Sequence, residues 1–117
     1  MPAPDFLSVD LAAECDNLAG EVNKLYQRVP WAAKHEAVAR LKRQVVKLSE
    51  EVRSAQDSHN RARTQKQLED ALSLIHECVP LLNLCQRKAL LSPELQERWV
   101  GRLSRLDKLL NEWLRAC

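Results

Sequence analysis

The apolar residues of this chain recur in steps of four and three along four separate segments. In the second segment, for example, the steps run through Val38, Leu41, Val45 and Leu48. Residues three and four apart share one face of a helix, so each segment predicts a helix with one buried seam. Short connections between such helices favour antiparallel neighbours. We therefore expect an all-α, antiparallel up-down-up-down four-helix bundle that forms a single domain over residues 1–117.

Local signals place the ends of the expected helices. Ser8 is a good N-cap for the first helix, and Val29 should end it because Pro30 disfavours helical geometry in the residue before it. Ser92 followed by Pro93 is a start signal for the last helix. Trp31 is taken as the opening residue of the second. The resulting ranges are about 8–29, 31–56, 61–88 and 93–116.

The polar stretch 54–60, SAQDSHN, separates the second and third helices. It has turn chemistry, and it can be read as a short loop or as a solvated continuation of the helix. A break near residues 57–60 is the favoured interpretation.

The third segment is apolar on most of its faces between residues 71 and 85, ALSLIHECVPLLNLC. A helix that is apolar nearly all round must be buried on more than one side. A small bundle offers little room for this, so the segment predicts self-association. Pro80 should also kink this helix. The expected interface residues are Leu74, Cys78, Leu81 and Leu84.

Cysteine usage and the chain start favour a cytoplasmic protein. No apolar run approaches the roughly 20 residues of a membrane span, and the first ten residues lack the basic and apolar parts of a signal peptide. The four cysteines are then expected to be reduced. His76, Cys78 and Cys85 could be read as part of a metal site, but the spacing H-x-C-x6-C matches no standard zinc pattern. Packing is the favoured role, and no metal or cofactor is expected.

Catalytic motifs are not recognisable in the sequence. Gly20 and Gly101 stand alone, so there is no phosphate-cradling glycine loop. No nucleophile elbow and no paired E-x-x-H motifs are found. Gly101 lowers helix propensity by about 1 kcal/mol and would permit a close backbone approach. We expect a protein that binds rather than an enzyme.

Basic residues are the remaining functional signal. The net charge is only +2, but residues 28–66 carry ten basic and four acidic side chains, whereas residues 1–27 carry one and five. Two rows at helical spacing stand out, with further basic residues near the second turn. They can be read as an ordinary solvated face or as contacts to nucleic-acid phosphates, which would be independent of base sequence and sensitive to salt. The candidate nucleic-acid-binding residues are Arg40, Arg43, Lys47, Arg61, Arg63, Arg98, Arg102 and Arg105.

Several landmarks resemble a bacterial family of four-helix bundles. This family contains the intervening-sequence proteins encoded within ribosomal RNA genes and the accessory variability determinants of diversity-generating retroelements. The Val29-Pro30 stop is similar to the family's proline after the first helix. The segments 41–45, LKRQV, and 71–77, ALSLIHE, resemble its second- and third-helix patterns. Ser92-Pro93 and the final NEWLRA, residues 111–116, resemble the last helix of the retroelement branch.

The resemblance covers residues 6–116, and it implies a homopentamer of bundles. Where the intervening-sequence branch carries a stretch like SIPSNIAEG, this chain reads KLSEEVRSAQ, which favours the retroelement branch. In that branch the resemblance implies a non-enzymatic accessory protein that binds RNA or DNA and partners a reverse transcriptase. The alternative is an oligomeric protein-interaction scaffold of the intervening-sequence type.

Overall fold

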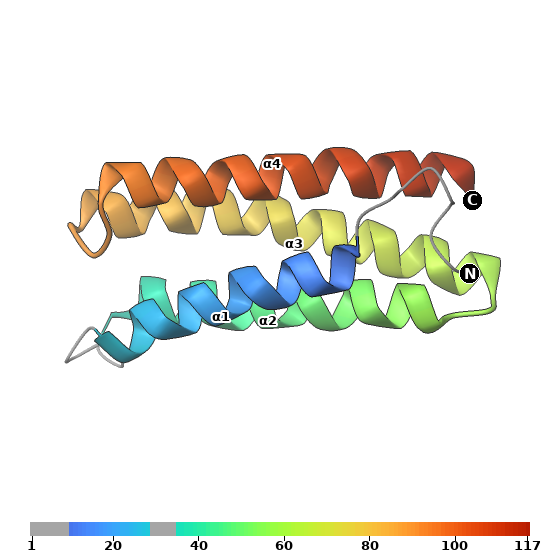
Figure 1. Ribbon diagram of the computed structural model, residues 1–117, viewed down its shortest axis with the longest axis horizontal. Coiled ribbons are helices and arrows are strands. Elements are labelled where there is room, and N and C mark those ends of the chain that lie inside the picture. The colour runs from blue at the N-terminus through green and yellow to red at the C-terminus, as the bar shows by residue number, and fades with distance from the viewer. Residues whose placement is uncertain (1–9, 29–34) are drawn as a thin grey trace.

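The computed structural model describes residues 10–28 and 35–117, and it places four helices and no strand in this part of the chain. They are α1 (Leu11–Arg28), α2 (Glu36–Asp57), α3 (Arg61–Arg87) and α4 (Pro93–Ala116). Figure 1 shows these helices lying alongside one another. Close packing joins consecutive helices, α1 with α2, α2 with α3, and α3 with α4.

Side-chain caps define the starts of three helices. Asp10 caps α1 by accepting a hydrogen bond of 3.1 Å from the Ala13 amide. The expected signals at Ser8, Val29 and Trp31 lie outside the described residues. Asn60 caps α3, because its side-chain oxygen accepts a hydrogen bond of 3.0 Å from the Arg63 amide. The break after α2 therefore falls where the turn chemistry predicted it. Ser92 caps α4, with Pro93 in its first turn, as expected.

The core is built from the predicted four-three seams. The α2 residues named for the predicted seam, Val38, Leu41, Val45 and Leu48, are all buried. In α4 the residues at the same kind of spacing are buried too, including the large indoles of Trp99 and Trp113. Trp99 and Trp113 are 2% and 1% exposed, so the described part of α4 keeps its aromatic surface inside the bundle. In α3, Ile75 and Leu82 are buried at this spacing, whereas Val79 between them is only half-buried.

Much of the apolar surface of α3 is buried within one chain, while Leu74, Val79 and Leu84 stay half-buried. α3 packs against both α2 and α4, so it has two covered sides. Val46 of α2, 39% exposed, is the large apolar side chain that stands out as exposed among the described residues. α3 therefore does not by itself require a partner subunit. The helix runs on through Pro80 to Arg87, and the expected kink stays a prediction.

A tight turn joins α3 to α4. Ala89 has a φ of 59°, the left-handed conformation that usually selects glycine, and the Leu90 amide donates 2.9 Å to the Cys85 carbonyl. This is the hydrogen bond of a Schellman motif, which reverses the chain directly after the helix. The reversal brings the start of α4 back along α3, where Gln96 donates 2.6 Å to Asn83.

Candidate nucleic-acid interface

The basic row of α2, defined as Arg40, Arg43 and Lys47, lies on the outer surface of the bundle. All three side chains are exposed. Arg43 donates 2.9 Å to Glu36, which lies two turns nearer the start of the helix. Arg40 and Lys47 have no ion-pair partner among residues 10–28 and 35–117. Two of the three cations are therefore free to meet an anion in solution.

Lys42, which was not predicted as a site residue, extends the positive surface of α2 toward α1. Its ammonium nitrogen lies 4.3 Å from the centre of the Tyr26 ring. Together with Arg43, Val46 and Lys47, these two side chains line a groove of about 450 Å³ on α1 and α2. The cation–π contact holds Lys42 over an aromatic face that its charge favours.

The basic row of α4, defined as Arg98, Arg102 and Arg105, has different surroundings. Arg98 donates 2.8 Å to Glu21, and Arg102 also donates to Glu21. Arg105 donates 2.9 Å to Glu14. All three arginines thus bridge α4 to carboxylates of α1. The structure gives them a role in holding the bundle closed, and any phosphate contact has to compete with these pairs.

The partners on α1 were not identified from the sequence, although a signal exists. Glu14 and Glu21 are seven residues apart, and so are Arg98 and Arg105. In an antiparallel pair of helices, equal spacing of opposite charges allows two pairs to form at once, the lower-numbered acid with the higher-numbered base. The observed pairs follow this order.

Glu21 is the centre of the α1–α4 seam. Its carboxylate accepts hydrogen bonds from both Arg98 and Arg102, and the Trp99 indole nitrogen lies 3.5 Å from it. Burial acts to raise the pKa of Glu21. The hydrogen bonds from Arg102 and Trp99 and the charges of Arg102 and Arg98 outweigh burial, so the pKa lies below its ordinary value of 4.5.

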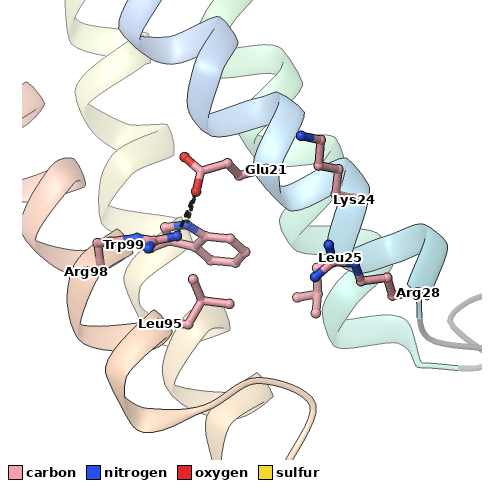
Figure 2. A pocket seen from close by; sticks show the side chains of 7 residues that line it. All are labelled: Glu21, Lys24, Leu25, Arg28, Leu95, Arg98 and Trp99. Carbon is pink, nitrogen blue, oxygen red and sulfur yellow. Dashed lines mark hydrogen bonds and ion pairs between the residues drawn. The ribbon is translucent and has the colours of Figure 1, made fainter.

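A cleft opens beside this seam, between the second half of α1 and the first half of α4. Figure 2 shows Lys24 and Arg28 projecting from α1 on one side, and Leu95 and Arg98 on the α4 side. The cleft has a volume of about 230 Å³. Both α1 cations are exposed and have no ion-pair partner among the described residues. Neither was predicted, although the two are four residues apart and therefore share one face of α1.

Arg61 and Arg63 lie at the start of α3, at the other end of α2 from Arg40. Both are exposed. A cation in the first turn of a helix faces the positive end of the helix dipole, which is mildly unfavourable. The structure therefore does not gather the eight predicted residues into one surface. It distributes them over the α2 face, the α1–α4 seam and the α2–α3 turn.

The four expected interface residues divide between core and surface. Cys78 and Leu81 are 0% and 7% exposed and pack in the core of the chain, which corrects their assignment to a subunit interface. They face inward because α3 is covered on two sides. Leu74 and Leu84 are half-buried and keep some surface on the α2–α3 side of the bundle.

The cysteines of the described helices are packing residues. Burial raises the pKa of Cys15 and of Cys78 to about 12 and that of Cys85 to about 11, so these thiols stay neutral. His76 is exposed and lies 3.0 Å from Asp107 of α4, away from the buried Cys78. In the described residues no three histidine, cysteine or acidic side chains gather in a way that could hold a metal ion.

The fold is shared with a solved bacterial protein. No protein-family model matches the chain, and no curated protein is similar to it in sequence. A crystal structure from Bacteroides thetaiotaomicron VPI-5482, described as a protein of unknown function from the S23 ribosomal protein family, matches it with a TM-score of 0.80. The match covers 90% of this chain and 95% of that chain at 19% identity, which shows a common fold.

None of the helices in the described residues has the length and apolar character needed to cross a membrane.

Proposed function

We propose that this protein is a non-enzymatic nucleic-acid-binding accessory protein of the cytoplasm, and that the basic row of α2 contacts phosphates. The observation that carries the proposal is the exposure of Arg40 and Lys47 without an ion partner in the described part of the chain. A rise of about 1.5 Å per residue separates these two positions by about 10 Å along the helix. Cations on such a line can follow a phosphate backbone.

Contact with the backbone, and not with the bases, fits the aromatic residues of the described helices. Trp99 and Trp113 are buried, and the Tyr26 ring is covered by Lys42. Stacking of single-stranded bases needs exposed aromatic faces, whereas phosphate contact needs only cations. Binding should therefore be salt-sensitive and nearly independent of base sequence.

Assembly of several copies would raise the affinity of the small basic row of α2 for nucleic acid. A row of three cations on one chain gives weak binding, and several linked copies raise the apparent affinity by avidity. We propose the up-down-up-down bundle as the subunit of a homopentamer, as the family resemblance implies. The half-buried Leu74 and Leu84 leave apolar surface for its contacts. The mass of the protein in solution tests this part, and a monomer at micromolar concentration would contradict it.

The partner proposed from the resemblance is RNA or DNA handled by a reverse transcriptase. The structural neighbour from the S23 ribosomal protein family shares the fold, and its description gives its function as unknown. Co-purification of the chain with a reverse transcriptase encoded nearby would test the second partner. Its absence from the neighbouring genes would remove that part of the proposal and leave nucleic-acid binding untouched.

The experiment for the proposed function is a titration of an RNA hairpin and of a DNA duplex with the full chain, repeated from about 50 to 200 mM salt. Phosphate contact predicts affinity that falls linearly on a log–log scale. Arg40→Ala with Lys47→Ala should reduce the slope, while Lys108→Ala with Arg115→Ala, which removes the same charge from exposed positions of α4, should leave it nearly unchanged. No binding at low salt, or a flat response, would overturn the proposal.

The second candidate is an oligomeric protein-interaction scaffold, favoured by the groove between α1 and α2. Val46 and Tyr26 both line this groove, and Val46 is a large apolar side chain that is exposed. A protein partner would bury Val46, whereas phosphate contact would not. Val46→Ser should then abolish a protein complex and leave nucleic-acid binding unchanged.

A further inference from the structure

The cleft between α1 and α4 is lined by more cationic side chains than the carboxylate of Glu21 can neutralise. Arg98, Lys24 and Arg28 stand around it, and Glu21 supplies the carboxylate. Glu21 is shared by two arginines, Arg98 and Arg102, so this group of three carries a net positive charge. Lys24 and Arg28 add two more charges that no described carboxylate offsets. An anion in this cleft would be held from both helices.

The remaining walls of the cleft are apolar. Leu25 of α1 and Leu95 of α4 are half-buried, and the buried Trp99 indole lies between Leu95 and Glu21 with its nitrogen turned to Glu21 (Figure 2). An apolar floor with a cationic rim matches a small organic group that carries a negative charge at its edge. At about 230 Å³ the cleft is smaller than the roughly 300–1,000 Å³ of pockets that enclose drug-sized ligands.

Phosphate fits this combination better than a carboxylate does. A phosphate group presents several strong acceptor oxygens, and arginine matches them with two parallel donors. Two arginines and a lysine on opposite walls can engage different oxygens of one group, while a neighbouring sugar rests on the leucines. A carboxylate has fewer oxygens to share among three cations from two helices.

We propose that the α1–α4 cleft is a phosphate-binding site, in which Lys24 and Arg28 hold the phosphate group and Arg98 is shared between the ligand and Glu21. Arg102 keeps its own bond to Glu21, so the seam stays closed when Arg98 turns to the ligand. A free nucleotide and a nucleic-acid strand both present this group, and the ligands tested below distinguish the two. The proposal does not rest on the basic row of α2, which lies on another helix.

The test uses the full chain labelled with ¹⁵N and titrated with inorganic phosphate, with adenosine monophosphate and with a dinucleotide that has one phosphodiester. We expect amide shifts around residues 24–28 and 95–98 with at least one of the three. Shifts with the monophosphates alone indicate a nucleotide site, and shifts with the dinucleotide alone indicate a strand site. Either result supports a phosphate site.

The matched variants decide whether the named residues form it. Lys24→Ala with Arg28→Ala should weaken binding about tenfold or more, because two charged hydrogen bonds are lost. Both side chains are exposed, so folding should be preserved; the milder Lys24→Gln with Arg28→Gln provides a second version of the test. Lys108→Ala with Arg115→Ala removes the same charge elsewhere and should have little effect.

Two outcomes would overturn the phosphate site. One is the absence of shifts in the cleft with all three ligands up to about 20 mM, a concentration far above ordinary metabolite affinities. The other is an equal loss of affinity in the two pairs of variants, which would mean binding by general charge. Arg40→Ala with Lys47→Ala should leave cleft binding intact, so failure of the proposed function at α2 is distinguishable from failure here.

Discussion

The basic rows of α2 and α4 look alike in the sequence and differ in the folded chain. Each consists of three cations at steps of three and four. In α4 every one of them donates to a carboxylate of α1, whereas in α2 only Arg43 has an ion partner, and that partner lies in the same helix. The α4 row therefore contributes to the stability of the bundle, and the α2 row is available to an external anion.

The difference comes from what lies opposite each row. α1 and α4 are not joined by the close helix packing that links consecutive helices, so long side chains have to span the space between them. Arginine is suited to this because its stem covers apolar surface while its planar head pairs with a carboxylate. The outer face of α2 has no helix across from it, and its cations stay in water.

The largest expected effect is the loss of folding stability when the α4 row is removed. Replacing Arg98, Arg102 and Arg105 together by alanine should lower the free energy of unfolding by about 2–3 kcal/mol, because Glu21 loses both donors in a partly buried seam. Urea denaturation measures this. The matched triple replacement of Arg40, Arg43 and Lys47 should change stability by less than about 0.5 kcal/mol per site. Equal losses from the two triples would contradict the distinction between the rows.

The next effect is on RNA affinity, for which the α2 row should matter more than the α4 row. Removing the α2 row should weaken binding to an RNA hairpin at about 50 mM salt by roughly tenfold or more, since three phosphate contacts are lost. Removing Arg105 alone should weaken it far less, because that guanidinium is already held by Glu14. Filter binding or fluorescence anisotropy measures both. A larger loss from Arg105→Ala than from Arg40→Ala would reverse the assignment.

Gly101 lies in α4 between Arg98 and Arg105, so replacing it changes the helix propensity of α4 without changing its charges. A Cβ at Gly101 would meet no described atom within 4 Å, so no backbone of residues 10–28 or 35–117 approaches this glycine closely. Gly101→Ala should therefore raise the unfolding free energy by about 1 kcal/mol through helix propensity. RNA affinity should be unchanged. A destabilised variant would show that something packs on this face.

Acid should act on the α4 seam through Glu21. Its lowered pKa means that the ionised carboxylate stabilises the folded chain above pH 4.5, and that this contribution is lost as the pH falls through the lowered value. Glu21→Gln lacks this group, so its stability should fall less than that of the unchanged protein between pH 6 and pH 3. Urea denaturation across this range measures the difference. Parallel curves would mean that Glu21 is not specifically paired.

Much of the fold could be predicted from the apolar spacing alone. The seam residues of α2 and α4 are buried, and the start of α4 at Ser92 and Pro93 is where the capping chemistry predicted it. These features depend on local geometry, which a sequence displays directly. The two neighbours of α3 could not be predicted from its apolar faces, because the sequence does not show how many helices pack against it.

The candidate site was harder to predict for the same reason. Arg102 and Arg40 have similar neighbours along the chain, and only the position of α1 distinguishes a bridging arginine from a free one. The matching spacing of Glu14 and Glu21 could have indicated the bridge. The cleft that collects Lys24 and Arg28 could not be predicted, because it is formed by two helices from opposite ends of the chain.

The most direct test of the account is to follow individual side chains while nucleic acid binds. The arginine Nε–Hε resonances of the ¹⁵N-labelled chain can be recorded as an RNA hairpin is added at low salt. We expect the signals of Arg40 and Arg43 to shift with saturation, and those of Arg102 and Arg105 to stay in place. Shifts confined to Arg102 and Arg105, with the α2 signals unmoved, would contradict the account.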